Sequence, residues 1–415
     1  MPLITYDQVA PFAGLIEYKT GLRDRAGAMP PWYAEKEIGI QHYKNDPSLS
    51  DEEIASISAW ARTGSPKGNS ADAPDPLAFD DSLKWTAGTP DIIVRTEPVT
   101  KLAGTPDWWG EIERVSIPLD EDRYVQSVEI VEVNDVDTQR SSGTVGGRYI
   151  FHHMIWSTAV LDENGRPTGD VTTWPTHEVG RNPDVFDPRA GMLLKAGSSV
   201  ISDSVHLHSN GRDTTGHLEI GFRLHPKGYE PIYEVSKDRL GNGSDISVAG
   251  DRADQELHAY YVLTEHAKIM SFEPHLHAPG ERMCLEAIWG YTIETLSCVG
   301  YDHNWVRGYT YQDDHAPLLP KGAVLHITGY MNNTNSNPNV PDPRNWQGSG
   351  NRSVTNMFID LGLRVQLTEE QFLNEMAQRR TNLNLGPNDH VIGCPLCLAP
   401  LISPYYPTSP LVLEE

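Results

Sequence analysis

The sequence predicts a mainly β protein, in which a small helical segment precedes two antiparallel β-sandwich domains of jelly-roll type. From about residue 90, the chain consists of short runs rich in β-branched and aromatic residues. Gly, Asp, Asn and many of the 31 prolines separate these runs, and no strand–helix–strand alternation is present. At 415 residues, the chain is also too long for one ordinary domain.

The order of these patterns predicts five parts. Residues 1–68 should form the helical segment, and residues 69–89 a linker rich in turn-forming residues. The two sandwiches are expected at 90–228 and 229–366, and a tail follows at 367–415.

Local signals predict where the helices begin and end. Apolar residues recur at near-helical spacing between Thr5 and Arg23. Ser50 and Glu53 have the spacing of a capping box, and Gly64 should end that second helix. Thr368 is expected to cap a short helix in the tail.

The expected strands fall into two groups, one for each sandwich. In the first group we expect runs at 92–94, 124–131, 148–151, 199–201 and 217–224. In the second group they lie at 259–263, 269–272, 283–289, 323–328 and 356–363.

Composition excludes several classes of partner. The net charge of −24 argues against binding to nucleic acid or to anionic membranes, because both require clustered cations. There is no apolar run long enough for a membrane span. Residues 1–6 have neither the charged nor the apolar region of a signal peptide.

The four cysteines have two different sequence contexts. Cys284 and Cys298 flank a predicted hairpin turn near Gly290, so a disulfide across the strands is plausible. Cys394 and Cys397 could form a disulfide in the tail or part of a metal site. A structural role is favoured, because no further ligand pattern accompanies them.

Histidines form three tight clusters. On a strand, the spacing of His275 and His277 places both imidazoles on one face, where they could bind one metal ion. The pair His206 and His208 has the same spacing. Adjacent residues on a strand point to opposite faces. The third cluster, at 152–153, can therefore bind one ion only where the strand bends or ends.

A metal held by His275 and His277 needs at least one further ligand. The sequence offers three more histidines and one thioether for this role: His303, His315, His326 and Met357. Imidazole with a thioether selects copper, whereas histidine with a carboxylate favours zinc or non-haem iron.

The order of these clusters resembles the copper type II ascorbate-dependent monooxygenases, the family of peptidylglycine α-hydroxylating and dopamine β-hydroxylating enzymes. It is similar in particular to bacterial relatives fused to a cytochrome c domain. The resemblance extends to about residue 366. The matching motifs are His152-His153-Met154, His206 with Asn210-Gly211, Pro274-His275-Leu276-His277, Tyr301-Asp302-His303-Asn304-Trp305 and Asn356-Met357.

The resemblance implies two copper sites, one in each sandwich. The first site takes electrons and consists of three histidines: His152, His153 and His206. His206 is preferred to His208 because Asn210-Gly211 follows it at the family's spacing. His208 is then an outer partner.

The second site implied by the family binds and activates oxygen. Its ligands are His275, His277 and Met357, of which Met357 is preferred to Met331 because it opens the last strand. Asn356 stands where the family usually has an acidic residue. The implied reaction is hydroxylation of a C–H bond in a small organic substrate with O2 and a reductant such as ascorbate or a cytochrome.

The helical segment resembles the C-terminal half of a class I cytochrome c domain. Its matching parts are Met29-Pro30-Pro31-Trp32, residues 45–49 and the helix after Ser50. Met29 corresponds to the distal haem ligand. The haem-attaching Cys-x-x-Cys-His is absent, so haem c is expected only if Met1 is an internal residue of a longer precursor that supplies it.

Both family resemblances imply maturation outside the cytoplasm, so a periplasmic or extracellular location is expected. Two other functions are compatible with the sequence. One is a non-catalytic copper-binding or electron-transfer protein with the same fold. The other is a secreted β-sandwich interaction module in which the histidines are incidental. The sequence does not identify the substrate.

Overall fold

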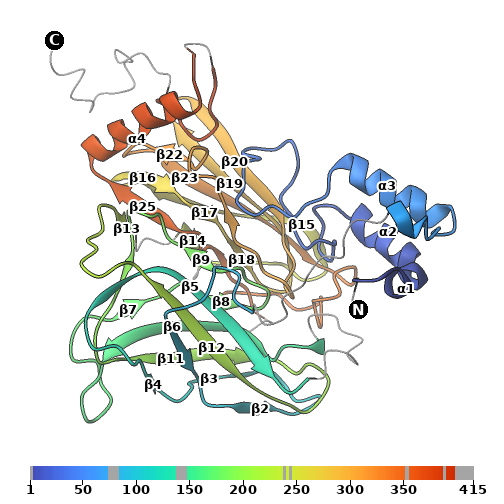
Figure 1. The fold of residues 1–415 in the computed structure, drawn as a ribbon, viewed down its shortest axis with the longest axis horizontal. Coiled ribbons are helices and arrows are strands. Elements are labelled where there is room, and N and C mark those ends of the chain that lie inside the picture. Colours follow the sequence, from blue (N-terminus) through green and yellow to red (C-terminus); the bar gives the residue numbers. More distant parts are fainter. Residues whose placement is uncertain are drawn as a thin grey trace.

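The computed structural model describes residues 3–72, 84–136, 147–236, 240–242, 245–350, 355–386 and 389–397. The chain is mainly β, with several antiparallel sheets and a small N-terminal helical segment, as predicted (Figure 1). The jelly-roll connectivity stays a prediction. Residues 73–83 of the expected linker and 398–415 of the expected tail lie outside the described residues.

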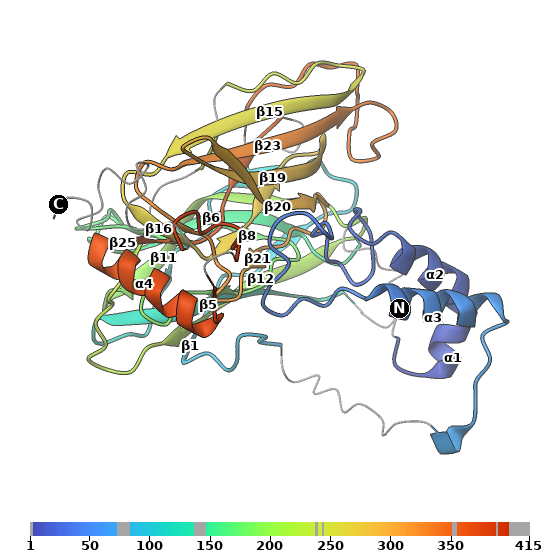
Figure 2. The same ribbon diagram turned by 90° about the horizontal axis from the view of Figure 1, so that it is seen from above.

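The N-terminal helices lie to one side of the sheets (Figure 2). The first helical run consists of α1 (Tyr6–Val9), η1 (Ala10–Phe12) and α2 (Ala13–Gly21). Helix α3 (Asp51–Arg62) begins at the predicted capping box, in which the Ser50 amide donates to Glu53 Oε2 over 2.8 Å. Gly64 follows α3 with φ of +87°, and η2 (Ser70–Asp72) precedes the linker.

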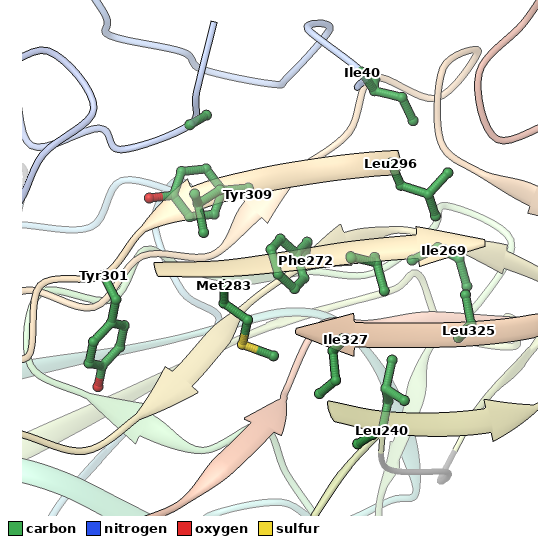
Figure 3. Packing of buried hydrophobic residues seen from close by; sticks show 14 of the residues in the cluster. Ile40, Leu240, Ile269, Phe272, Met283, Leu296, Tyr301, Tyr309, Leu325 and Ile327 are labelled. Atoms are coloured by element: carbon green, nitrogen blue, oxygen red, sulfur yellow. The ribbon is translucent and has the colours of Figure 1, made fainter. Parts of the chain in front are cut away.

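The segment between α2 and α3 packs against the second group of sheets. Trp32, Tyr33 and Tyr43 are buried in the same core as residues of the second sandwich. The Ile40 amide donates to the Leu296 carbonyl over 2.8 Å, and Ile40 and Leu296 appear together in Figure 3. These residues are therefore part of the larger β structure.

Two six-stranded sheets form the first sandwich, and their facing side chains share one core that includes Trp156, Phe222 and Ile220. One sheet contains β1 (Ile92–Arg95), β2 (Val99–Lys101), β5 (Arg123–Asn134), β9 (Asp184–Val185), β10 (Met192–Leu194) and β12 (Thr214–Leu224). The other contains β3 (Trp108–Gly110), β4 (Val115–Ser116), β6 (Phe151–Val160), β7 (Thr172–Thr173), β8 (His177–Glu178) and β11 (Ser198–Leu207).

The second β region is divided among more sheets, which surround a core that includes Phe272, Met283 and Ile327 (Figure 3). Its main sheet contains β15 (Arg252–Val262), β23 (Val324–Asn333), β19 (Gly280–Trp289) and β20 (Thr292–Gly300). A second sheet contains β13 (Glu234–Val235), β25 (Arg364–Leu367), β16 (His266–Ile269) and β22 (Leu318–Leu319). The shorter sheets are formed by β14 (Leu240–Asn242), β24 (Phe358–Asp360) and β18 (Pro274–Leu276), and by β17 (Ser271–Phe272) and β21 (Tyr309–Thr310).

The run expected as a strand at 269–272 is interrupted and does not continue to His275 as one strand. The chain from 266 to 276 forms three short strands, β16, β17 and β18, each in a different sheet. It changes partners because the Met270 amide bonds to the Leu363 carbonyl, while the Glu273 amide bonds to the Asp360 carboxylate. The two bends bring the histidine pair to the boundary with the first sandwich.

Both pairs of cysteines form disulfides. Cys284 and Cys298 lie directly opposite each other on β19 and β20, which confirms the predicted cross-strand bond. Cys394 and Cys397 form the second disulfide, in a core shared with helix α4 (Glu369–Asn382). Helix α4 begins at Thr368 as predicted but is longer than expected. Disulfides are typical of proteins in oxidising, extracellular or periplasmic settings.

In the described part of the chain, none of the helices has both the length and the apolar character needed to span a bilayer.

Candidate metal centre

A β-bulge brings the two adjacent histidines to the same place. On the paired strands β6 and β11, His153 lies opposite His206, but the next pair is Phe151 with Leu207. His152 is therefore an extra residue on β6. A bulge of this kind bends the strand and turns a side chain away from its regular face. This is the local bend that two adjacent histidines require in order to share one ion.

His152, His153 and His206 together form a buried group that could bind a metal ion. Their ligand nitrogens lie within 4.8 Å of one another, and the three residues are 7%, 3% and 1% exposed. His206 Nε2 donates to Asp107 Oδ2 over 2.9 Å, which leaves its Nδ1 available. Among the described residues, neither this nitrogen nor His152 Nδ1 has a hydrogen-bond partner.

Trp109 covers part of this group. It lies on β3 directly opposite His206, and its ring is 4.7 Å from that of His153 and 5.7 Å from that of His206 between centroids. The indole therefore covers the imidazoles of His153 and His206 on this side.

The second histidine pair is also buried, and its rings are oriented by hydrogen bonds. His275 Nδ1 donates to Glu178 Oε1, and His277 Nδ1 donates to the Thr355 carbonyl over 3.0 Å. Both rings therefore present Nε2 as the free nitrogen. Their centroids are 5.4 Å apart, and His277 Nε2 has no hydrogen-bond partner among the described residues. Fixing one nitrogen so that the other can bind is the usual arrangement of a metal-ligating histidine.

Met357 lies beside this pair in the sheet register. Strand β18 pairs with β24 so that His275 is opposite Ile359 and Leu276 is opposite Phe358. Extending the same register by one residue puts Met357 opposite His277. The amide of Met357 donates to the side chain of Asn356, which is fully buried, over 3.0 Å.

The two groups lie next to each other across the boundary between the sheet regions. The ring of His153 is 6.2 Å from that of His275 and 6.5 Å from that of His277 between centroids. Glu178, the partner of His275, lies opposite His153 on β8. The five histidines expected at two separate sites therefore form one continuous buried cluster.

Buried charges strengthen this boundary. Arg181 donates from Nε to Glu273 Oε1 over 2.6 Å and from Nη2 to Asp184 Oδ1 over 2.8 Å. Glu273 lies two residues before His275, so this ion pair ties the ligand-bearing segment to the first sandwich. A bidentate arginine pair of this kind sets geometry as well as attraction.

The cluster contains two further histidines. His208 lies 5.2 Å from His152 between ring centroids, and its Nε2 donates to the Tyr149 carbonyl over 3.0 Å. His303 lies 4.6 Å from His152 and belongs to the segment between β20 and β21.

Of the other candidate ligands for the second pair, His315 and His326 lie elsewhere. His315 stacks on His42, with 3.7 Å between centroids, and His326 stacks on Tyr260 at 4.3 Å. From the sequence, His303 was one of four candidates for the further ligand of the second pair. The matching stretch from Tyr301 to Trp305 contains this histidine, but the resemblance gave it no ligand role.

Burial favours the neutral form of several imidazoles in the cluster. It lowers the pKa of His152, His153 and His277 well below the ordinary histidine value, and the neighbouring imidazoles lower each pKa further. Burial likewise lowers the pKa of His303 to about 4. Neutral imidazole is the form that binds metals. His152, His153, His277 and His303 are thus neutral nitrogen donors, and imidazole donors suit copper, zinc, iron or nickel.

Comparison with known proteins assigns no family. No family model and no curated protein sequence matches this chain. Among solved structures, a chain of the cowpea mosaic virus top component, the naturally occurring empty particles, is similar over 72% of this chain and 95% of its own length. The two are 8% identical and superpose with a TM-score of 0.29, a level of similarity from which we draw nothing about function.

Proposed function

We propose that the protein is a copper-dependent monooxygenase, which hydroxylates a C–H bond of a small organic substrate with O2 and an external reductant. The main supporting observation is that five predicted ligand histidines, distant in sequence, lie in one buried cluster. Several of their ring nitrogens have no hydrogen-bond partner among the described residues. The order of the sequence motifs supports the same family of enzymes.

In this proposal, the ligands divide into two sets. His152, His153 and His206 hold the ion that receives electrons. His275, His277 and Met357 hold the ion at which oxygen reacts, and the soft thioether favours Cu(I) at that position. Copper bound in these sites would supply one-electron redox chemistry with dioxygen.

The chain's own residues contribute orientation and exclusion of water. Glu178 and the Thr355 carbonyl hold the Nδ1 protons of His275 and His277, so both rings direct Nε2 to one ion. The overall reaction balances when one oxygen atom enters the C–H bond and the other leaves as water. Two electrons and two protons then come from outside the site.

The electron donor would be a small reductant such as ascorbate, or a cytochrome. The disulfides and the family both favour a periplasmic or extracellular location. Haem c in the N-terminal segment requires a Cys-x-x-Cys-His motif, which this sequence lacks. A longer precursor would have to supply that motif, and Met29 would be the distal ligand.

Copper loading followed by oxygen-uptake measurements tests the proposal. The protein should bind two copper ions and consume O2 with ascorbate and a suitable member of a substrate panel. Stoichiometric copper without turnover across a broad panel would favour the non-catalytic copper protein instead. Absence of copper after dialysis would contradict both functions and favour an interaction module.

Substitution of the thioether tests the assignment of the second site. Met357→Ile should abolish oxygen chemistry, because the ion there loses its third ligand. The three-histidine site should stay filled, and copper analysis with electron paramagnetic resonance would measure the occupancy of each site. Met192→Ile, on β10 and away from the cluster, is the matched control. Retained activity in Met357→Ile would overturn this ligand set.

A further inference from the structure

We propose that His303 is a fourth imidazole ligand of the ion held by His152, His153 and His206, donated from the second β region across the boundary. The proposal rests on the copper sites proposed above but assigns a ligand that the sequence motifs do not. The ligands of the first site would then come from both sheet regions.

Proximity is the first argument. The centroid distance between His303 and His152 is 4.6 Å. Within the three-histidine group itself, the distances are larger: 5.6 Å between His152 and His153, and 5.0 Å from His206 to each of the other two. Imidazoles that share a tetrahedral ion through nitrogens at about 2.0 Å have centroids roughly 5 Å apart. His303 is therefore as close to His152 as a shared ion requires. It lies outside the group whose ligand atoms are all within 4.8 Å of one another, so binding of the ion would draw its ring toward His153 and His206.

The second argument is an unpartnered nitrogen. His303 is 8% exposed, and its buried Nδ1 has no hydrogen-bond partner among the described residues. His152 Nδ1 is buried and unpartnered in the same way. Leaving a buried polar atom without a partner is unfavourable, because the atom loses its hydrogen bonds to water and gains none in return. Two such atoms on adjacent rings are accounted for if both bind one ion.

Two buried histidines outside the cluster, His225 and His266, have different surroundings. His225 Nε2 bonds to the Ala190 carbonyl over 3.0 Å, and its ring stacks on Tyr229. His266 Nδ1 accepts from the Lys321 amide over 3.1 Å, and its ring stacks on Phe372. Each of these rings has both a hydrogen bond and an aromatic partner. By contrast, the aromatic neighbours found for His303 are His152 and, at 6.5 Å, Tyr301.

The backbone around His303 is held in position from both sides. Tyr301, labelled in Figure 3, donates its hydroxyl to the Leu276 carbonyl over 2.6 Å, between the two histidines of the second pair. On the other side, the Val306 amide donates to the Val179 carbonyl over 3.0 Å, which joins this segment to the first sandwich. The loop is thus anchored to both regions, as a preorganised ligand requires.

A four-imidazole site differs in function from a three-imidazole site. Closed four-coordinate sites leave no position open for substrate or oxygen. The first ion would then serve electron transfer alone, and oxygen chemistry would be confined to the ion held by His275, His277 and Met357. Binding of the first ion would also fasten the two sheet regions together.

Counting imidazoles on bound Cu(II) tests the proposal. The full chain carrying His275→Ala and His277→Ala keeps only the first site. This protein would be stripped of metal, loaded with one equivalent of Cu(II), and measured by pulsed electron paramagnetic resonance. We expect four coordinated imidazoles. Adding His303→Phe should reduce the count to three and weaken Cu(II) binding by at least about tenfold, the loss seen even for outer partners of metal sites.

His315→Phe, added to the same background, is the matched control. His315 is another histidine of the second region with an unpartnered Nδ1, but it stacks on His42 away from the cluster. This variant should retain four imidazoles and unchanged affinity.

If the protein that carries only His275→Ala and His277→Ala shows three imidazoles on its Cu(II), the role of His303 is overturned. This outcome does not depend on whether His303→Phe folds. Equal counts and affinities with and without His303→Phe would also overturn it, while leaving the copper proposal intact. Failure of the unmodified chain to bind Cu(II) would overturn the proposed function as well.

Discussion

At the scale of single residues, Glu178 connects the two histidine groups. It lies opposite His153 on β8, and its carboxylate accepts a hydrogen bond from His275 Nδ1. Burial alone would raise the pKa of Glu178, but contact with His275 and Arg181 outweighs burial and keeps this pKa below its ordinary value. The carboxylate therefore stays ionised and fixes the tautomer of His275.

We predict that Glu178→Gln weakens copper binding at the second site by about 10–100-fold, because His275 loses a charged partner that orients its ring. Copper titration with resolution of the two sites by electron paramagnetic resonance would measure this loss. Affinity at the three-histidine site should not change, whereas a general structural defect would weaken both sites. Glu163→Gln, at an exposed position, is the matched control. Equal loss at both sites would contradict the positioning role.

At the scale of elements, the hairpin of β19 and β20 carries the best-defined covalent link. Cys284 and Cys298 are 14 residues apart and pair directly across the two strands. Cys394 and Cys397 are only 3 residues apart. In the chain-entropy account, a disulfide stabilises more when it closes a longer loop, because it removes more freedom from the unfolded chain.

Removing the hairpin disulfide with Cys284→Ala and Cys298→Ala should lower the free energy of unfolding by about 3 kcal/mol. The matched double variant, Cys394→Ala with Cys397→Ala, should cost about 2 kcal/mol because its loop is shorter. Denaturant unfolding would compare the two. If removing the disulfide between Cys394 and Cys397 lowers the free energy of unfolding more, then native packing around α4, and not loop closure, determines the relative stabilities of the two variants.

At the scale of the whole molecule, a buried ion network joins three parts of the chain. Lys268 on β16 is 1% exposed and contacts Asp187 of the first sandwich at 3.2 Å and Glu375 of α4 at 3.3 Å. Arg189 bonds to both carboxylates. Charges this deeply buried are held only when they are paired.

Lys268→Ala should therefore destabilise the protein by about 3–5 kcal/mol, because it leaves buried carboxylates with less compensation. Urea unfolding would measure the loss. The control is Lys321→Ala, which removes an exposed pair with Glu265 at 3.5 Å and should cost less than about 1 kcal/mol.

The loss of stability caused by Lys268→Ala should depend on pH. Burial alone would raise the pKa values of Asp187 and Glu375, but Arg189 and Lys268 outweigh it and hold both below their ordinary values. The stability that these carboxylates contribute is thus present above about pH 4.5 and is lost as the pH falls, since the unfolded chain takes up protons first. The difference between wild type and Lys268→Ala should shrink accordingly. A constant difference from pH 7 to about pH 3.5 would contradict this account.

Much of the local structure could be predicted because it depends on residues close together in the chain. The capping box at Ser50, the cap at Thr368 and the hairpin that pairs Cys284 with Cys298 appear as expected. Strand boundaries were less predictable. The run before His275 is broken by bonds to Leu363 and Asp360, which lie roughly ninety residues further along.

The candidate site was only partly predictable for the same reason. Pairs such as His275 and His277 are visible as spacings, and a bulge was required for His152 and His153 to act together. No spacing reveals that His303 approaches His152 or that Glu178 holds His275, contacts that join residues 151 and 97 positions apart.

Local order alone thus identifies the β class, the helix ends, the hairpin and the histidine pairs, because each depends on periodicity or on neighbours within a turn. Tertiary packing alone unites those pairs in one buried cluster, adds His303, and supplies Glu178 and Arg181 from the opposite sheet region. The physical reason is that the imidazoles are buried, and several of their nitrogens left without hydrogen-bond partners among the described residues, only where the two sheet regions meet.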